Sequence, residues 1–362
     1  MKNERKITLP QTIVPLLLDW FAVNARDLPW RKNRDPYRIW ISEIMLQQTR
    51  VEAVIPYYER FLAALPDIRS LAQADDDKLM KLWQGLGYYS RARNLKRAAQ
   101  KIMAEFGGIF PSKPEQILSL PGIGSYTAGA IASIAFEKPV PAVDGNVLRV
   151  LSRIMESKEN IDLPAVRQNF TEQLRAIYPK GHCGAFTQSL MELGALICLP
   201  NGAPLCGSCP LASLCRAFRN GTWNTLPVRT EKKSRRVEEK TVLLLFHEDE
   251  IALKKRPAKG LLAGLYEFPN REGFLSPEQL KKENPDWEID RSPLNAVHIF
   301  THVEWRMRGY RIRCAEKDPE YLWVTREQLK EQFSIPSAFK TFLIDAQGIP
   351  SRKRSRKSPR AK

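Results

Sequence analysis

The sequence predicts a mostly helical region over residues 1–222, followed by a small α+β domain over residues 240–346. Up to residue 220, apolar side chains recur at the three- and four-residue spacing of amphipathic helices. Beyond residue 240 the spacing changes to the alternation of half-buried strands. The stretch between the two, residues 223–239, is rich in proline and charge and is predicted to be a linker.

The spacing also predicts individual elements. A β-hairpin is expected where strands 241–246 and 251–255 flank an acidic turn. The other expected elements of the second domain are strands at 296–300, 307–314 and 321–324 and helices at 327–332 and 337–343. Helices of the first region are expected at 16–20, 39–46, 54–62, 79–82, 95–103, 127–136, 147–155, 170–177 and 186–197.

The chain of 362 residues carries a formal net charge of +17. Seven of its 57 lysines and arginines lie in a predicted disordered tail at 347–362, and the remaining net charge of +10 predicts a polyanionic partner, most simply nucleic acid. No apolar run approaches the ~18 residues of a membrane span. The charged first residues do not resemble a secretory leader, so a cytoplasmic protein is expected.

Four of the six cysteines lie close together, with the spacing C-x7-C-x2-C-x5-C. Clustered thiolates in a cytosolic protein usually bind metal. Structural zinc sites usually pair two C-x2-C turns across a longer loop, whereas here one short loop supplies every ligand. This arrangement favours a [4Fe–4S] cluster over zinc, and four unliganded thiols are the remaining alternative. The ligands would be Cys198, Cys206, Cys209 and Cys215.

A second motif, LPGIGSYTA at residues 120–128, indicates a tight turn between two helices. Gly122 and Gly124 permit positive φ and a close approach of another backbone. The helix that follows directs its free N–H groups toward an anion such as a DNA phosphate. The motif therefore predicts a helix–hairpin–helix, which contacts the DNA backbone without reading the base sequence.

Two acidic residues are candidates for catalysis. Glu43 falls between Ile39 and Trp40 on a helical projection, so its carboxyl group should be desolvated and its pKa raised. Asp144 precedes a helix expected near Asn146 and could simply cap it, as Glu43 could simply pair with an arginine. Cleavage of an N-glycosidic bond, however, requires two carboxyl groups in unlike environments. One protonates the leaving base, and the other stays ionised beside the developing oxocarbenium ion.

Several motifs occur in order along the chain: LPWR at 28–31, SEIMLQQT at 42–49, LGYYSRA at 86–92, the hairpin, VDGNV at 143–147 and the four cysteines. In this combination the sequence resembles, from about residue 10 to beyond residue 340, the helix–hairpin–helix DNA glycosylases. Among them it is similar to the adenine DNA glycosylases of the MutY type, although its first cysteine spacer has seven residues where that family usually has six. The resemblance implies a nucleoid-associated monomer with a [4Fe–4S] cluster, acting on double-stranded DNA that carries an 8-oxoguanine:adenine or guanine:adenine mispair.

The resemblance also implies roles for single residues. Glu43 matches the general acid that protonates adenine N7 and then assists water, and Asp144 matches the carboxylate that stabilises the sugar cation. Gln48 and Tyr88 match the wedge inserted into the base stack when adenine is flipped. For Tyr88, Trp30 and Leu46, ordinary core packing is the alternative. The remaining matches are Tyr126 and Asn146 in the catalytic pocket, Trp30, Arg31, Leu46 and Gln188 in the adenine pocket, and Gln47, Thr49 and Gly87 in the same motifs.

Tyr126 distinguishes two sister activities. In the endonuclease III type, the residue two after the second hairpin glycine is a lysine that attacks the sugar and permits strand cleavage. Here that residue is Tyr126, which cannot form a Schiff base, so the resemblance implies a monofunctional glycosylase. The alternatives are an endonuclease III-like pyrimidine glycosylase with lyase activity and a non-catalytic DNA-binding iron–sulfur protein.

The C-terminal domain resembles the Nudix fold through GLLAGLYEFP at residues 260–269. The metal-binding helix of Nudix hydrolases is not found between residues 270 and 290, so that hydrolysis is not expected. In adenine glycosylases this domain instead recognises 8-oxoguanine through a Phe-Ser-His loop. Phe300, Thr301 and His302 occupy that place, and the threonine keeps a hydroxyl donor. A structural role for His302 is the alternative.

Overall fold

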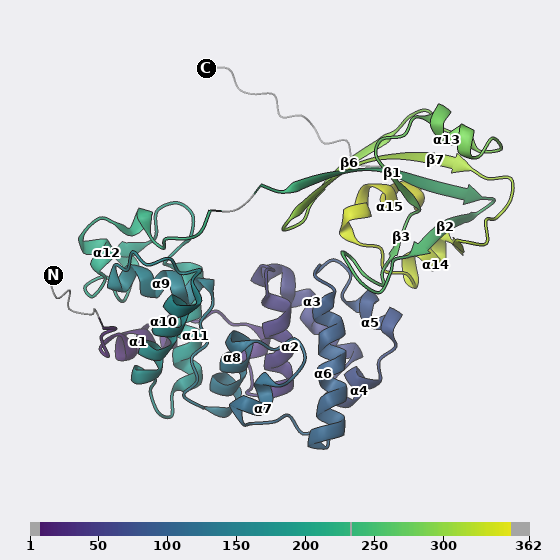
Figure 1. The fold of residues 1–362 in the computed structure, drawn as a ribbon. Helices are drawn as coiled ribbons and strands as arrows, with labels where there is room; N and C mark the ends of the chain where they lie inside the picture. The colour runs from purple at the N-terminus through teal and green to yellow at the C-terminus, as the bar shows by residue number, and fades with distance from the viewer. Residues whose placement is uncertain (1–7, 232–233, 349–362) are drawn as a thin grey trace. The chain divides into compact units, whose positions relative to one another are not determined.

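The computed structural model describes residues 8–231 and 234–348, so the tail predicted at 347–362 lies almost entirely outside the described residues. Contacts divide the chain into two compact units. One contains Met1–Ala74 and Arg93–Lys232, and the other contains Asp75–Ala92 and Lys233–Lys362. Figure 1 shows that the first unit is helical and that the second is built on a β-sheet, which confirms the predicted fold class. Among the described residues, no helix is long and apolar enough to cross a membrane.

Every helix predicted in the helical region overlaps an observed one. Helix α6 (Ser90–Phe106) begins in the second unit and ends in the first. The other elements of the first unit are α1 (Ile13–Asn24), η1 (Pro29–Arg31), α2 (Pro36–Leu46), α3 (Val51–Ala64), α4 (Ile68–Gln73), α7 (Pro114–Leu118), α8 (Ser125–Phe136), α9 (Gly145–Met155), α10 (Pro164–Ile177), α11 (Cys183–Leu196), η2 (Cys206–Ser208), α12 (Arg216–Arg219) and η3 (Trp223–Thr225).

Helix α11 organises the first unit, because α1, α8 and α9 all contact it. Helix α2 packs on α8 and α3, and its start follows from local sequence. Asp35 caps it by accepting a 2.9 Å hydrogen bond from the Tyr37 N–H, and Pro36 fits the first helical position because no N–H partner is needed there. From Tyr37 to Met45, every residue of α2 except Arg38 is buried. A polar side chain on this helix therefore enters an apolar environment.

The hairpin motif forms the predicted junction, with α7 leading into a turn and α8 leading out. Gly122 has a φ of +77°, and a Cβ there would lie 2.6 Å from the Asn94 Cβ, so only glycine fits. The prediction of a positive φ is wrong for Gly124, whose φ is −96°. Apart from Gly124 and its two chain neighbours, no heavy atom of the described residues lies within 4 Å of the place where a Gly124 Cβ would be. The absent side chain therefore leaves the N-terminus of α8 open.

The second unit contains one mixed sheet, and each strand and helix predicted for it overlaps an observed element. The sheet is covered by short helices, and segment Asp75–Ala92 contributes one more helix to the unit. The elements are α5 (Asp76–Leu82), β1 (Arg236–His247), β2 (Glu250–Lys255), β3 (Tyr266–Glu267), β4 (Asn270–Glu272), α13 (Pro277–Glu283), β5 (Glu288–Ile289), β6 (Leu294–Ile299), β7 (Val303–Arg313), β8 (Leu322–Thr325), α14 (Arg326–Glu331), η4 (Ser337–Phe339) and α15 (Lys340–Ala346).

Strand β1 is the central strand of this sheet. It pairs antiparallel with β2, as the predicted hairpin requires, and parallel with β7. The strand begins at Arg236, so the last residues of the predicted linker are in fact paired, with Arg236 opposite Val303. The alternation of β1 gives the sheet two apolar faces: Val242 and Leu244 lie in one core with α15, and Leu243 and Leu245 lie in another with α13. Figure 1 shows these two helices on opposite sides of the sheet.

Candidate active site

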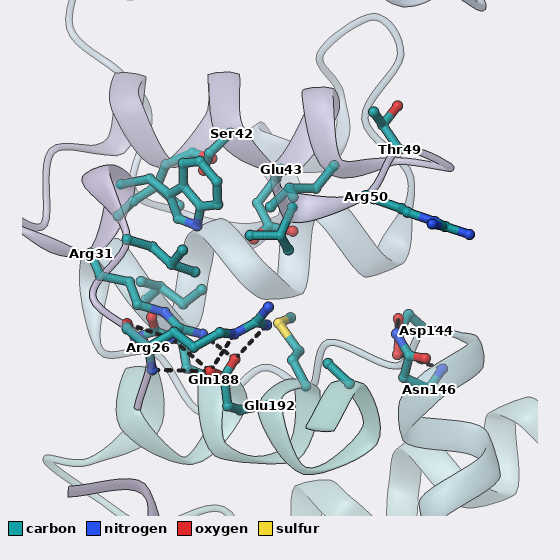
Figure 2. A pocket seen from close by; sticks show the side chains of 18 of the residues that line it. Arg26, Arg31, Ser42, Glu43, Thr49, Arg50, Asp144, Asn146, Gln188 and Glu192 are labelled. Atoms are coloured by element: carbon teal, nitrogen blue, oxygen red, sulfur yellow. Dashed lines mark hydrogen bonds and ion pairs between the residues drawn. The ribbon is translucent and has the colours of Figure 1, made fainter. Parts of the chain in front are cut away.

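A cavity of about 230 Å³ opens in the first unit between α2, α8 and α11 and the start of α9. Figure 2 shows Glu43 entering this space from α2, with Gln188 and Glu192 on α11 and with Asp144 and Asn146 at the start of α9. The cavity thus collects residues that are far apart in sequence. The predicted site residues that line it are Trp30, Arg31, Glu43, Leu46, Thr49, Tyr126, Asp144, Asn146 and Gln188.

Glu43 is buried, with 6% of its surface exposed. The pKa of its carboxyl group is raised to about 7, chiefly by burial and also by the nearby Asp144. A 2.9 Å hydrogen bond from the Tyr126 hydroxyl opposes this shift, as does the charge of Arg31. The predicted rise in pKa is confirmed, and the side chain is poised to carry a proton near neutral pH.

Asp144 is the N-cap of α9, so the capping alternative is correct. The same side chain also lines the cavity. Its Oδ1 accepts hydrogen bonds from the N–H groups of Asn146 (2.9 Å) and Val147 (2.8 Å), and its Oδ2 accepts one from Asn146 Nδ2 (2.8 Å). Burial raises the pKa of Asp144 above its ordinary value, although these hydrogen bonds act to lower it. The environments of the two carboxyl groups therefore differ, with one donor at Glu43 and three at Asp144.

Asn146 is itself held in place. Arg149 donates to its Oδ1 at 3.0 Å, and the same guanidinium donates to the carbonyls of Gly194 (2.7 Å) and Cys198 (2.8 Å). A Cβ on Gly194 would lie 2.8 Å from the Asn146 Cβ, so the glycine permits this close packing of α11 on α9. A continuous path of hydrogen bonds therefore joins Asp144 to the backbone at the first cysteine.

A charged group that the sequence did not predict forms another wall of the cavity. Glu192 in α11 is 1% exposed and accepts 2.8 Å hydrogen bonds from Arg26 Nε and Arg31 Nη2. Burial alone would raise its pKa, but the hydrogen bonds from the two arginines hold it at about 2. Glu192 stands four residues after Gln188 in an apolar helix, the same signal that singled out Glu43. No local pattern in the sequence singles out Arg26 as a partner of Glu192.

The two predicted wedge residues share a backbone feature. Gln48 has a φ of +60° and Tyr88 a φ of +46°. Both values lie in the left-handed region, which residues other than glycine rarely adopt. Beside Gln48, the Gln47 amide donates to the Thr127 hydroxyl at 3.3 Å. Gly87, with a φ of +69°, precedes Tyr88. The structure places Gln48 in the first unit and Tyr88 in the second.

Phe300, Thr301 and His302 form the turn between β6 and β7 in the second unit. The Phe300 ring packs edge-on against His298 and Trp305, at centroid distances of 4.6 and 4.9 Å. Thr301 and His302 are exposed, so both are accessible at the surface of the second unit.

The four clustered cysteines form no disulfide and line one small cavity in the first unit. Most of the other lining is apolar, but Arg153 Nη1 lies 3.2 Å from the Cys198 sulfur. In the part of the chain that the structure describes, no three His, Cys, Asp or Glu side chains are grouped closely enough to hold a single metal ion. The donor set is thus four sulfurs around a shared apolar space.

The pKa of Glu43 predicts a pH dependence of stability. Because its folded pKa is about 7 against an ordinary 4.5, the unfolded chain loses this proton first, and the free energy of unfolding falls as pH rises between these values. Glu43→Gln removes the effect, so its stability advantage over the wild type should grow to about 3 kcal/mol by about pH 8. Thermal unfolding between about pH 5 and about pH 8 measures this difference. Glu59→Gln, on the exposed side of α3, is the control, and a pH-independent advantage for Glu43→Gln would refute the assignment.

The Glu192 group predicts a second effect on stability. Glu192→Gln leaves two arginines around a buried neutral amide and should destabilise the fold by about 3 to 5 kcal/mol at neutral pH. In the wild type this contribution is present above about pH 4.5 and is lost as pH falls toward 2, because the folded pKa is lowered. Thermal unfolding of the matched control Arg34→Gln, whose ion pair with Glu137 is more exposed, should show a loss of at most about 1 kcal/mol. Equal losses in the two variants would contradict this account.

Comparisons with known proteins agree with the fold. The HhH-GPD superfamily base excision DNA repair protein model matches residues 41–176, and a NUDIX domain model matches residues 241–345. Among solved structures, a thermostable thymine-DNA glycosylase is 30% identical with a TM-score of 0.54, over 58% of this chain and 96% of that one. A non-covalent Endonuclease III–DNA complex, 24% identical with a TM-score of 0.50 over 59% of this chain and 98% of that one, shares the fold.

Curated relatives extend the similarity along most of the chain. An adenine DNA glycosylase of Rattus norvegicus is 33% identical over 91% of this chain and 77% of its own length. One of Buchnera aphidicola subsp. Schizaphis graminum (strain Sg) is 36% identical over 79% of this chain and 83% of its own. One of Arabidopsis thaliana is 38% identical over 79% of this chain, which spans only 55% of that relative. The chain belongs to the adenine DNA glycosylase family.

Proposed function

We propose that this chain is a monofunctional glycosylase that acts as a monomer on double-stranded DNA. It hydrolyses the N-glycosidic bond of adenine mispaired with 8-oxoguanine or guanine. The observation that carries the proposal is the buried Glu43, whose pKa is about 7, in the same cavity as the capped Asp144. A group that is partly protonated at neutral pH can donate to a leaving base, and a second carboxyl group can offset the positive charge left on the sugar.

In the proposed reaction, Glu43 donates its proton to adenine N7. The bond between the sugar C1′ and the base N9 breaks, and its electron pair leaves with the base. Asp144, held by the N–H groups of Asn146 and Val147, stabilises the oxocarbenium ion on the sugar. The Glu43 carboxylate then accepts a proton from the water that attacks C1′, which restores the acid for the next cycle.

The base pocket would be formed by the other residues of the cavity. Trp30 offers an aromatic surface and packs edge-on against Tyr58, with ring centroids 5.4 Å apart. Gln188 and Arg31 supply polar groups near the base, and the ion pair to Glu192 fixes the guanidinium of Arg31. An adenine must leave the helix stack to reach this cavity, which is the step that the wedge residues Gln48 and Tyr88 would assist.

The absence of a nucleophilic amine supports hydrolysis without strand cleavage. Among the described residues, those that line the cavity include three arginines and no lysine. Tyr126 occupies the position where a lyase would carry lysine, and its hydroxyl is hydrogen-bonded to Glu43. Schiff-base formation needs an amine, so the product should be an intact strand with an abasic site.

Contacts outside the cavity would bind and select the DNA. The open N-terminus of α8, after Gly122 and Gly124, suits a phosphate of the backbone. The exposed Thr301 and His302 would contact the base opposite adenine and favour 8-oxoguanine over guanine.

The cysteine loop would hold a [4Fe–4S] cluster. Its four cysteine sulfurs share an apolar cavity, and this all-sulfur donor set fits such a cluster. Cys198, Cys206, Cys209 and Cys215 would be the ligands. When bound, the cluster ties the loop together, and the path through Arg149 would then hold Asn146 beside Asp144.

Single-turnover cleavage of a duplex with adenine opposite 8-oxoguanine tests this function, with each sample divided and half treated with hot alkali. The wild type should give breaks only after alkali, because base loss leaves an alkali-labile site. Glu43→Gln should bind the duplex but give no breaks, whereas the control Glu59→Gln should match the wild type. Breaks without alkali would show an amine nucleophile and a lyase. No breaks from wild-type protein that binds the duplex would refute the proposed function.

A further inference from the structure

Segment Asp75–Ala92 is part of the second unit, although the sequence places it within the helical region. It contains α5 at one end and the proposed wedge residue Tyr88 near the other. Contacts at both ends of the segment attach it to the sheet domain.

The first attachment joins α5 to the residues around the end of α14. The Lys81 ammonium donates to the carbonyls of Lys330 and, at 3.0 Å, of Phe333. Gln84 Nε2 donates to the carbonyl of Ile335 at 3.2 Å. The last carbonyls of a helix lack partners within the helix, and a lysine side chain satisfies them well. We call these two side chains, Lys81 and Gln84, the link.

The second attachment lies at the wedge. The Tyr88 hydroxyl is 3.1 Å from the Thr301 hydroxyl, and the tyrosine is nevertheless 47% exposed. Arg91 fixes the loop behind it, since its guanidinium donates to the carbonyls of Leu86 (2.9 Å) and Gly87 (3.1 Å) and lies over the Tyr88 ring at 5.7 Å. The wedge is therefore held next to the turn that would contact the opposite base.

The two attachments are connected through the core of the sheet domain. Ile335, whose carbonyl the link binds, is 1% exposed and belongs to the same apolar cluster as Trp305. Trp305 in turn packs against Phe300, which precedes Thr301. A shift of α5 relative to α14 would therefore move Tyr88 relative to Thr301.

We propose that Lys81 and Gln84 are positioning residues that hold Tyr88 against Thr301, so that wedge insertion and recognition of the opposite base occur at one base step. This inference rests on the proposed function, because it assigns the two exposed groups to the same DNA. Its consequence is specific: loss of the link weakens the preference for 8-oxoguanine and spares the chemistry in the cavity of the first unit.

The double variant Lys81→Met/Gln84→Leu tests the inference, because it removes the donors and keeps side chains of similar length. Single-turnover excision of adenine opposite 8-oxoguanine should slow by about tenfold, the loss expected from about three hydrogen bonds of uneven strength. Excision opposite guanine should stay within about twofold, so the ratio of the two rates falls. Lys78→Met, which removes an exposed charge from the same helix, should keep the wild-type ratio. Lys81→Arg with Gln84 intact keeps the donors and should restore the ratio.

An unchanged ratio in the double variant would overturn the inference, as would an equal loss of both rates, which indicates a general defect in folding or binding. Hydrogen exchange separates a failure here from a failure of the proposed function. If the wild type excises no adenine, the proposed function is refuted. Amide exchange over residues 84–92 still tests whether Lys81 and Gln84 hold this segment in place. Faster exchange there in the double variant than in Lys78→Met supports the link, and equal exchange refutes it.

Discussion

The burial of one carboxyl group, that of Glu43, is the constraint on which the rest of the site depends. Helix α2 is buried along most of its length, so a glutamate on it cannot reach bulk water, and its pKa rises to about 7. The surrounding helices supply what an isolated buried acid lacks. Helix α8 brings Tyr126 to hydrogen-bond it, and the cap of α9 brings Asp144 close enough to contribute to the raised pKa.

The cavity holds two buried glutamates with opposite electrostatics. Glu192 faces two guanidinium groups and stays ionised, whereas Glu43 accepts one hydroxyl hydrogen bond and binds a proton far more readily. The arginines therefore do not leave Glu43 fully ionised, because the nearer carboxylate satisfies most of their charge. Glu43 can therefore carry a proton near neutral pH, whereas Glu192 remains an anion paired with the two arginines.

The features that could be predicted from the sequence are local ones. Asp35 and Pro36 mark the start of α2, apolar spacing places Glu43 on its buried face, and Asp144 precedes its helix as a cap. What could not be predicted depends on distant partners. Arg26 and Glu192 are 166 positions apart, and the start of β1 at Arg236 is set by pairing with β7 rather than by apolar residues. The attachment of Asp75–Ala92 to the sheet domain likewise follows from backbone carbonyls more than two hundred residues away.

The most direct measurement is the pH dependence of single-turnover adenine excision by the wild type and by Tyr126→Phe. If the buried Glu43 is the proton donor, the wild-type rate should be level just below about pH 7 and fall about tenfold per pH unit above it. The hydrogen bond from the Tyr126 hydroxyl lowers the pKa of Glu43. Tyr126→Phe should therefore move the pH at which the rate begins to fall to a higher value. A rate that falls from about pH 4.5, or a break that Tyr126→Phe leaves in place, would contradict the account.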